Sequence, residues 1–415
     1  MKEIRIEGRK PLEGEIKIQG SKNAALPIMA AALLHKGEII LHQCPDIADV
    51  HTMAEIMKKL GVKIQYKNHT MVLDCSHVKE TRIDFTEGRK MRSSVILLGS
   101  LLGRFQDACI PYPGGCVIGK RPIDLHIWAL EKLGVSFFEK ESVLVAQRKK
   151  LQGTEIVFSG SSVGATQNAV LASVLAEGVT RLKNCACEPE VIWLCDFLCS
   201  CGAKITGAGS RTICIRGVEK LHGTEYTIPP DRIVAGTYVC ASAITRSQIV
   251  LSNAPIEEME ALLCLYQKMG GQYEAIGGKL SLCSRWVQYP IMRQCTEVYP
   301  GFPTDLQSPL MAVLSTIPGQ SCLVENIFED RFRTADQLKK MGADIHIKGR
   351  EAWIRGGTLK GARVEAQELR GGAALVIAGL AAEGVTYIEN PQYIERGYED
   401  ICQDLKMLGA AIEIE

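Results

Sequence analysis

One stretch of the chain, residues 113–126, places a thiol among glycines and cationic side chains. It reads P-G-G-C-V-I-G-K-R-P-I-D-L-H, with Cys116 between glycines and Lys120 and Arg121 just beyond it. A nearby cation lowers the pKa of a cysteine from about 8.5 and so favours the reactive thiolate. The same cations suit a phosphorylated or carboxylated substrate. The pattern predicts a mobile loop that carries chemistry, and a surface hairpin with a stray free thiol is the alternative.

Several apolar stretches of the chain begin with a charged residue. Four such residues are Lys22, Arg92, Asp305 and Arg370. Unpaired N–H groups at a helix start favour anions, and basic side chains add discrete donors, so the recurring set predicts a shared anion site. A single such residue is usually only solvated. Asp305 follows two prolines that rigidify its approach, which suits a positioned base; an ordinary acid near a helix start is the alternative.

The elements that must position these residues form a sixfold repeat. Six helical runs end in a pair whose second member is glycine: Gly61, Gly134, Gly202, Gly270, Gly342 and Gly409. Each copy opens with an apolar helix of small residues, predicted at 24–34, 93–102, 165–175, 235–244, 306–314 and 371–381. A strand rich in β-branched residues follows each opening. Glycine can end a helix in the left-handed conformation, so the repeat predicts six compact α/β units.

The six units divide into two domains of three. Two prolines in T-I-P-P-D-R, at residues 227–232, exclude a continuous helix and indicate a crossing between domains. A strand-like stretch at residues 13–20 indicates a second crossing. We therefore expect one domain at 20–229, which carries the cysteine loop, and another at 1–19 plus 230–415. Two such domains would enclose a cleft for a small molecule and close over it.

Composition excludes several classes of function. The 415 residues include 48 basic and 47 acidic side chains, so no overall field points to nucleic acid or an anionic membrane. The N-terminus lacks the apolar core of a signal peptide, and no apolar run is long enough to span a bilayer, so we predict a cytoplasmic protein.

The 16 cysteines do not suggest a disulfide scaffold. Many fall in apolar helical runs of a large chain, among them Cys195, Cys199, Cys240 and Cys264, so we expect reduced, buried thiols. No C-x-x-C pair occurs, and we predict no metal site.

The motifs together resemble those of one family, the UDP-N-acetylglucosamine 1-carboxyvinyltransferases, which are enolpyruvyl transferases. The resemblance covers essentially the whole chain. Besides the cysteine stretch it rests on G-S-K-N-A-A-L-P at 20–27, S-V-G-A-T at 162–166, P-G-F-P-T-D at 300–305 and E-R-G-Y-E-D at 395–400. It implies an inside-out α/β barrel of two domains, three repeated units in each, with substrate bound in the cleft between the domains.

The resemblance also implies the reaction. The enolpyruvyl group of phosphoenolpyruvate is transferred to the 3'-hydroxyl of UDP-N-acetylglucosamine and phosphate is released, which is the first committed step of peptidoglycan biosynthesis. Addition and elimination need an acid for the methylene carbon, a base for the hydroxyl and cations for the anionic groups. By family likeness Cys116 is the acid, forms an adduct with phosphoenolpyruvate and is the fosfomycin target. Asp305 is the base that deprotonates the sugar hydroxyl or the tetrahedral intermediate, and Lys22 and Arg396 complete the catalytic set.

Binding residues follow from the same resemblance. Those for phosphoenolpyruvate are Lys22, Arg92, Arg121, Arg331, Arg370 and Arg396. Those for UDP-N-acetylglucosamine are Asn23, Arg92, Arg121, Pro122, Asp124, Leu125, Ser162, Val163, Gly164, Asp305 and Ile327. The resemblance implies no metal and no organic cofactor. We expect no nucleic-acid or membrane partner, and a monomer or weak homo-oligomer.

One departure keeps alternatives open. The family pattern leads us to expect aspartate two residues before Arg370, and this chain has Glu368 there, which puts the placement of Arg370 in question. A weakly active or non-catalytic paralogue that binds UDP-sugar as a regulator is therefore one alternative. The shikimate-pathway enolpyruvyl transferase is another, although that family lacks the P-G-G-C loop.

Overall fold

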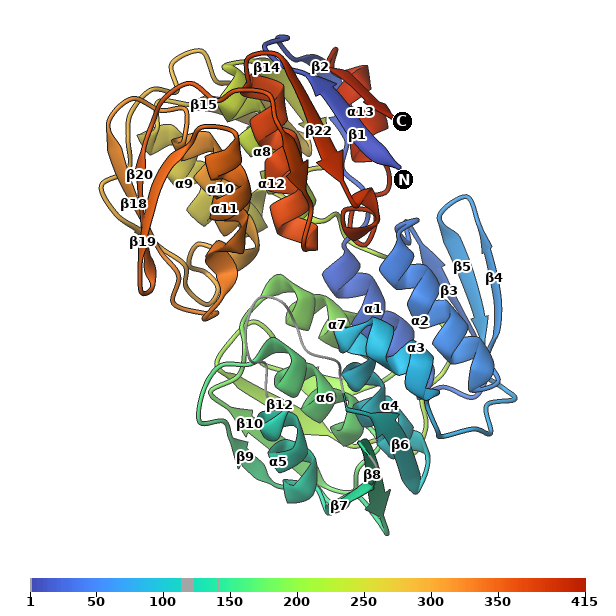
Figure 1. Cartoon of the computed structure of the whole chain (residues 1–415). Coiled ribbons are helices and arrows are strands. Elements are labelled where there is room, and N and C mark those ends of the chain that lie inside the picture. Colours follow the sequence, from blue (N-terminus) through green and yellow to red (C-terminus); the bar gives the residue numbers. More distant parts are fainter. Residues whose placement is uncertain (1, 113–122, 141) are drawn as a thin grey trace. The chain divides into compact units, whose positions relative to one another are not determined.

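The computed structural model describes residues 2–112, 123–140 and 142–415. Within these ranges the chain separates into two compact units (Figure 1). The first unit holds residues 20–112, 123–140 and 142–229, and the second unit holds residues 2–19 and 230–415. Cys116, Arg121 and Pro122, all of which the sequence singles out, lie outside the described residues.

Three sheets are described in the first unit. One is ordered β13-β3-β5-β4, from β3 (Glu38–His42), β4 (Lys63–Lys67), β5 (Thr70–Asp74) and β13 (Glu225–Thr227). The next is β6-β8-β7, from β6 (Asp107–Pro111), β7 (Val135–Lys140) and β8 (Val143–Arg148). The last is β11-β12-β10-β9, from β9 (Glu155–Val157), β10 (Val179–Lys183), β11 (Lys204–Thr206) and β12 (Thr212–Arg216).

The second unit has the same kind of sheets. One is ordered β15-β16-β14-β2, from β2 (Glu13–Lys17), β14 (Gln248–Ser252), β15 (Gln272–Ile276) and β16 (Lys279–Cys283). Another is β17-β18-β20-β19, from β17 (Gln294–Cys295), β18 (Gln320–Val324), β19 (Asp344–Lys348) and β20 (Glu351–Arg355). The third is β21-β22-β1-β23, from β1 (Glu3–Glu7), β21 (Arg363–Glu365), β22 (Val385–Glu389) and β23 (Ala411–Ile414).

A shared pairing pattern shows that the six sheets are copies of one unit. Each four-stranded sheet has one parallel pair at an edge and antiparallel pairs elsewhere. In the three-stranded sheet an isolated parallel bridge between Arg82 and Cys109 stands in the corresponding place. The prediction of an α/β fold with six repeated units is confirmed.

The inner helices carry the repeat openings predicted from the sequence. In the first unit they are α1 (Lys22–Ala32), α4 (Leu97–Arg104) and α6 (Val163–Ser173), and in the second α8 (Arg232–Thr245), α10 (Gln307–Leu314) and α12 (Leu369–Ala381). They are buried along almost their whole length; in α12 every residue from Leu369 to Leu380 is buried. Small residues allow close packing: a Cβ on Gly99 of α4 would lie 2.5 Å from the carbonyl oxygen of Asn168 in α6.

Six of the described outer helices end as the sequence predicts. They are α2 (Ala48–Lys59), α5 (Asp124–Lys132), α7 (Pro189–Ser200), α9 (Glu260–Lys268), α11 (Thr334–Lys340) and α13 (Ile401–Met407). A further short helix, α3 (Phe85–Lys90), ends at Met91 without a glycine. The six glycines that follow the repeated endings have φ between +88° at Gly342 and +103° at Gly61 and Gly270. Glycine has no Cβ and adopts this conformation without strain, so the residue type itself ends the helix.

Short 3-10 turns precede or interrupt several helices. They are η1 (Arg92–Ile96), η2 (Ile256–Met259), η3 (Thr304–Leu306), η4 (Arg331–Arg333) and η5 (Pro391–Tyr393). Three residues singled out by the sequence lie in them: Arg92, Asp305 and Arg331.

The expectation of buried cysteines is wrong at two positions. Cys195 and Cys240 are buried, but Cys199 and Cys264 are exposed. Cys199 lies one turn after Cys195, at the end of α7 where the helix faces solvent. An apolar run that is uniform on all sides does not reveal which face is covered, and this is why the sequence misled.

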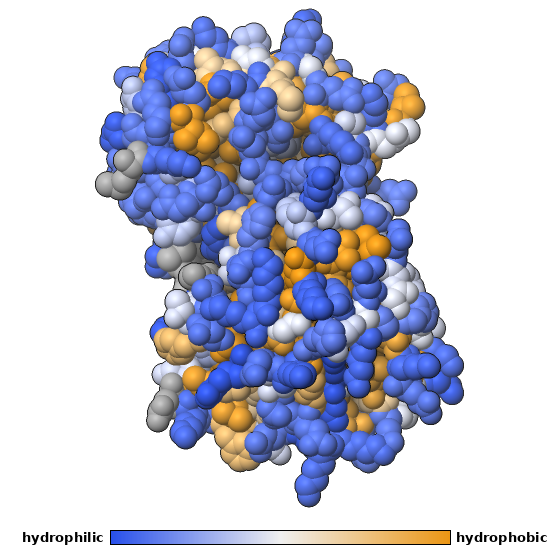
Figure 2. Space-filling model, turned by 90° about the vertical axis from the view of Figure 1, so that its right-hand side faces the viewer, coloured by the Kyte–Doolittle hydropathy of each residue, from blue (hydrophilic) through white to orange (hydrophobic). Residues whose placement is uncertain are grey.

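The surface has no continuous apolar face in the view of Figure 2, where hydrophobic residues form separate patches among hydrophilic ones. Within the described ranges, no helix combines the length and the apolar character needed to cross a bilayer.

Candidate active site

Asp305 accepts hydrogen bonds from two buried arginines in the second unit. Arg331 Nη2 donates to Oδ1 at 3.0 Å, while Arg370 donates to Oδ2 from Nε at 3.3 Å and from Nη2 at 3.2 Å. The side chains of Arg331 and Arg370 are 2% and 3% exposed, whereas that of Asp305 is 29% exposed. The carboxylate therefore reaches solvent with its orientation fixed from the protein side, as a proton acceptor requires.

The backbone of η3 presents this carboxylate. Pro303 immediately precedes the turn and offers no side-chain cap, and Thr304 Oγ1 donates to Glu325 Oε2 at 2.8 Å. Asp305 therefore lies in the first turn of a helical element, as the simpler interpretation held, but its carboxylate binds arginines instead. Proline fixes φ, which restricts the approach to Asp305.

Arg331 lies in η4 and is buried. Its guanidinium carbon lies 5.6 Å from the centroid of the Phe328 ring. Its buried Nε has no hydrogen-bond partner among the described residues. Leaving such a donor unsatisfied costs roughly 1–3 kcal/mol, so this N–H is suited to an anionic ligand beside Asp305.

Glu368 resolves the question about Arg370. Glu368 is the N-cap of α12, and its carboxylate accepts from the backbone N–H of Gly371 and, at 2.9 Å, from that of Arg370. The longer side chain thus caps the helix and leaves the Arg370 guanidinium on Asp305. Burial alone would lower the pKa of Arg370, but its interactions with Tyr398 and with the carboxylates of Asp305 and Asp231 raise it, so the guanidinium stays charged.

Lys22 is the first residue of α1 in the first unit and is paired with a buried acid. Its Nζ lies 2.6 Å from Asp49 Oδ2, and the two side chains are 12% and 5% exposed. Ser21 caps the helix by accepting from Ala24 N at 3.3 Å, and Asn23 is half-buried. Sequence reasoning assigned no role to Asp49, although an acid on the buried face of α2 was a signal that could have identified it.

A buried histidine joins several predicted substrate residues of the first unit. Asn168 Nδ2 donates to His126 Nδ1 at 2.7 Å, and a Cβ on Gly164 would lie 2.8 Å from His126 Cε1. Burial and the charge of Arg92 lower the pKa of His126 to about 4, against the opposing effect of Asp124. The structure therefore brings Arg92, Asp124 and Gly164 to one neutral imidazole, which the sequence did not select.

The remaining predicted residues are placed as follows. Ser162 caps α6 by accepting from Ala165 N at 3.3 Å, and Val163 begins that helix, while Leu125 lies in the first turn of α5. Arg396 is half-buried in the turn after η5. Ile327 is 36% exposed, and its N–H donates to Glu325 Oε1 at 2.8 Å.

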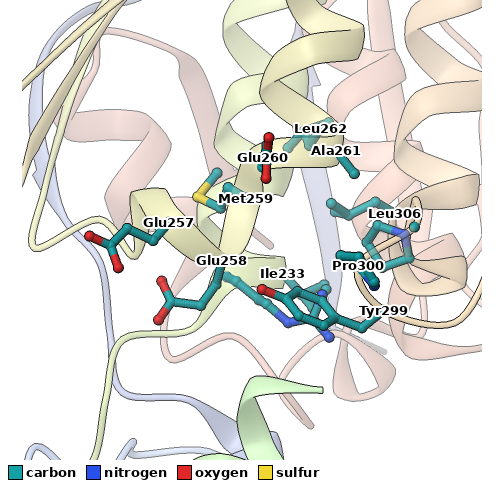
Figure 3. A pocket seen from close by; sticks show the side chains of 13 residues that line it. Ile233, Glu257, Glu258, Met259, Glu260, Ala261, Leu262, Tyr299, Pro300 and Leu306 are labelled. Atoms are coloured by element: carbon teal, nitrogen blue, oxygen red, sulfur yellow. The ribbon is translucent and has the colours of Figure 1, made fainter. Parts of the chain in front are cut away.

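A small pocket lies beside η3 in the second unit (Figure 3). Arg232 lines it at the start of α8 and lies over the Tyr299 ring, with its guanidinium carbon 5.6 Å from the centroid. Tyr299 and Leu306 lie across from Glu257 in the figure. The lining contains none of the residues predicted for substrate, and the sequence marked Arg232 only as part of a crossing segment.

No metal-binding cluster of histidine, cysteine, aspartate and glutamate is found among the described residues. What the arrangement offers instead is a fixed carboxylate in the second unit and cationic side chains at helix starts in both units. Such groups serve proton transfer and anion binding.

The chain is similar to proteins of known families. The family model for EPSP synthase (3-phosphoshikimate 1-carboxyvinyltransferase) matches residues 6–405. A Caldanaerobacter subterraneus subsp. tengcongensis protein, UDP-N-acetylglucosamine 1-carboxyvinyltransferase 2, is 45% identical over 413 residues, which is 99% of each chain. A Desulfovibrio desulfuricans UDP-N-acetylglucosamine 1-carboxyvinyltransferase is 42% identical over 419 residues, with 100% of each chain covered.

Solved structures share the fold. The enolpyruvyl transferase NikO from Streptomyces tendae superposes with a TM-score of 0.90 at 23% identity, covering 100% of this chain and 98% of its own. An EPSP synthase from Acinetobacter baumannii gives a TM-score of 0.75 at 19% identity, with 100% of both chains covered. The architecture is therefore that of the enolpyruvyl transferases, and by sequence the chain belongs to the UDP-N-acetylglucosamine 1-carboxyvinyltransferase family.

Proposed function

We propose that the protein transfers the enolpyruvyl group of phosphoenolpyruvate to the 3'-hydroxyl of UDP-N-acetylglucosamine and releases phosphate, the first committed step of peptidoglycan biosynthesis. The observation that carries this proposal is the partly exposed Asp305 carboxylate held by buried Arg331 and Arg370. The relatives supply the identity of the acceptor, since two of them bear that sugar nucleotide in their names.

Proton transfers divide the reaction into two steps. In the addition, Asp305 takes the proton of the 3'-hydroxyl, the oxygen bonds to carbon 2 of phosphoenolpyruvate, and Cys116 gives a proton to carbon 3. In the elimination, the Cys116 thiolate takes a proton back from carbon 3, the bond between carbon 2 and the phosphate oxygen breaks, and the departing phosphate takes the proton held by Asp305. A general base of this kind contributes roughly 10²–10⁴-fold to the rate. The role of Cys116 rests on the family resemblance.

Cationic side chains would hold the phosphate and carboxylate of phosphoenolpyruvate. We assign this role to Lys22, Arg92, Arg121, Arg331, Arg370 and Arg396. Support comes from Arg331, whose buried Nε has no partner among the described residues, and from Lys22, whose ammonium is held in place by Asp49. Charge-assisted hydrogen bonds from such groups are about twice as strong as neutral ones.

UDP-N-acetylglucosamine would bind at the beginning of α6 and α5. The N–H groups of Val163 and Gly164 lie at the start of α6 behind the Ser162 cap, and unpaired N–H groups at such a start suit phosphate. Asp124 and Leu125 begin α5. We assign the remaining contacts to Asn23, Arg92, Arg121, Pro122, Asp305 and Ile327.

We further propose that the enzyme works in the cytoplasm as a monomer or weak homo-oligomer on these two small molecules. Nearly balanced charge, with 48 basic and 47 acidic side chains, supports small-molecule substrates over nucleic acid or a membrane surface.

Phosphate release tests this function. We expect turnover with phosphoenolpyruvate plus UDP-N-acetylglucosamine and none with phosphoenolpyruvate plus 3-phosphoshikimate. Cys116→Ser should abolish turnover while the sugar nucleotide still binds, because a hydroxyl is a far weaker acid than a thiol. Fosfomycin should add to Cys116, as mass spectrometry would show. Turnover only with 3-phosphoshikimate, or sugar-nucleotide binding without any turnover, would overturn the proposal.

A further inference from the structure

We propose that Tyr398 is a positioning residue that holds the guanidinium of Arg370 and, through it, the carboxylate of Asp305. The inference rests on the proposed function, in which Asp305 takes the sugar proton. Tyr398 belongs to the E-R-G-Y-E-D motif, from which the proposed mechanism uses only Arg396. It is 1% exposed, so it does not itself meet substrate.

Arg370 bridges Tyr398 and Asp305. Its Nη1 donates to Tyr398 Oη at 3.4 Å, and its guanidinium carbon lies 5.7 Å from the Tyr398 ring centroid. Its Nε and Nη2 donate to Asp305 Oδ2 at 3.3 and 3.2 Å. Because the guanidinium is planar and rigid, fixing Nη1 on the tyrosine also fixes the two donors that face the carboxylate.

Tyr398 is in turn anchored to α8. Its Oη lies 2.7 Å from Thr237 Oγ1, and Thr237 Oγ1 donates to the carbonyl of Ile233 at 2.8 Å. A hydroxyl has one proton, so Thr237 must accept from Tyr398, and Tyr398 Oη accepts from Arg370. The hydrogen bonds thus run in one direction, from Arg370 through two hydroxyls to the backbone of a buried helix.

The charges around Arg370 explain why a neutral group suits this place. Asp305 and Asp231 both act on Arg370, and Asp231 is fixed as the α8 N-cap by accepting from Ile233 N at 2.8 Å and Val234 N at 3.0 Å. Burial raises the pKa of Tyr398, so it remains a neutral phenol. It binds the guanidinium without adding a third negative charge.

Tyr398→Phe removes the hydroxyl and keeps the ring. We expect kcat/KM for phosphoenolpyruvate to fall about ten-fold, since misplacement near the reacting groups is costly, while the Kd of UDP-N-acetylglucosamine shifts less than about three-fold. Tyr266→Phe is the matched control, because Tyr266 is equally buried in the second unit and its Oη lies 2.7 Å from Ser284 Oγ. Similar kcat/KM in the two variants would overturn the inference.

A double-mutant cycle tests whether Tyr398 acts through Arg370. Arg370→Lys lacks the fork that reaches both partners, so adding Tyr398→Phe to it should change kcat/KM by less than about two-fold. If the fold-changes in kcat/KM of the two single substitutions multiply in the double variant, Tyr398 acts independently of Arg370 and the proposal is overturned.

A readout without turnover separates this inference from the proposed function. In protein labelled with ¹⁵N-arginine, the Arg370 Nε–H signal, identified by its loss in Arg370→Lys, should be protected from exchange in the wild type and lose that protection in Tyr398→Phe. An unchanged signal overturns the inference even in an active enzyme. A wild type that binds neither substrate, yet shows the protected signal and its loss, would remove the proposed function and leave the positioning role supported.

Discussion

The inner helices of the two units begin differently. In the first unit, Ser21 and Ser162 cap α1 and α6 with neutral hydroxyls. In the second unit, Asp231 and Glu368 cap α8 and α12 with carboxylates. A helix start carries about half a positive charge, which a carboxylate neutralises and a hydroxyl does not. The same repeated architecture thus carries neutral caps on these helices in the first unit and charged caps in the second.

The two kinds of cap suit two kinds of work. In the first unit, Lys22 and Arg92 stand at helix starts, and we propose that they bind the anionic groups of phosphoenolpyruvate. The second unit balances charge internally, and in doing so it fixes one carboxylate, Asp305, between Arg331 and Arg370. Repetition of a fold therefore need not repeat its electrostatics, because the caps of corresponding helices differ in charge.

Asp305→Asn, in the second unit, should have the largest effect on turnover. We expect kcat to fall by about 10³-fold, because an amide cannot accept the hydroxyl proton while its shape is kept. Steady-state phosphate release measures it. Asp336→Asn, which alters an exposed acid of α11, is the control and should leave kcat unchanged. Turnover of Asp305→Asn within ten-fold of wild type would show that another group is the base.

Lys22→Met, in the first unit, should weaken binding of the anionic substrate. We expect kcat/KM for phosphoenolpyruvate to fall about 100-fold, since a partly desolvated charge pair to the ligand is lost. Asp49→Asn should cost about ten-fold, because the ammonium remains but loses the partner that orients it. Lys58→Met, at an exposed lysine of α2, is the matched control. If Lys22→Met behaves like that control, Lys22 is structural.

Asp404→Asn removes an ionisable group of the second unit and should change how stability depends on pH. Burial raises the pKa of Asp404 from 3.8 to about 6, although Tyr238 donates to it. Between those pH values the folded state binds more protons than the unfolded state, so the wild type loses about 2–3 kcal/mol as pH rises from about 4 to 6. Thermal unfolding at several pH values should show that the stability of the variant relative to the wild type increases as pH rises. A difference in stability that does not change with pH would contradict this.

His126→Gln should show the opposite slope in the first unit. Burial and Arg92 lower the pKa of His126 from 6.5 to about 4, so between these values the unfolded state binds more protons. The wild type therefore loses about 3 kcal/mol as pH falls through this window. The variant should gain on the wild type in Tm as pH falls, and a gain on raising the pH would refute the assignment.

Ser162→Asp converts a first-unit cap to the second-unit type and should give the smallest change in stability. We expect a gain of about 0.5–1 kcal/mol from the helix dipole, with UDP-N-acetylglucosamine bound several-fold more weakly because the carboxylate repels its diphosphate. Calorimetry and titration measure the two effects. Ser162→Ala is the control for loss of the cap alone. Tighter or unchanged sugar-nucleotide binding would show that the start of α6 does not meet the phosphates.

Local features of the fold were predictable, and distant partnerships were not. The glycine endings could be predicted because tolerance of a positive φ is a property of glycine itself, and Gly61 and Gly342 both adopt one. Asp49 and Tyr398 were missed as partners because their roles depend on Lys22 and Arg370, which lie far from them in the chain. Periodicity places a helix, but it does not say which side chain from another element meets it.

Carbon-13 NMR of the reaction product tests the proposed transfer most directly. Phosphoenolpyruvate labelled at carbon 2 is incubated with the enzyme and UDP-N-acetylglucosamine. We predict loss of the coupling between that carbon and phosphorus, and a new enol ether signal correlated with the proton on carbon 3 of the sugar. A labelled carbon that stays bonded to phosphate, or a signal of free pyruvate without a correlation to the sugar, would contradict enolpyruvyl transfer by this protein.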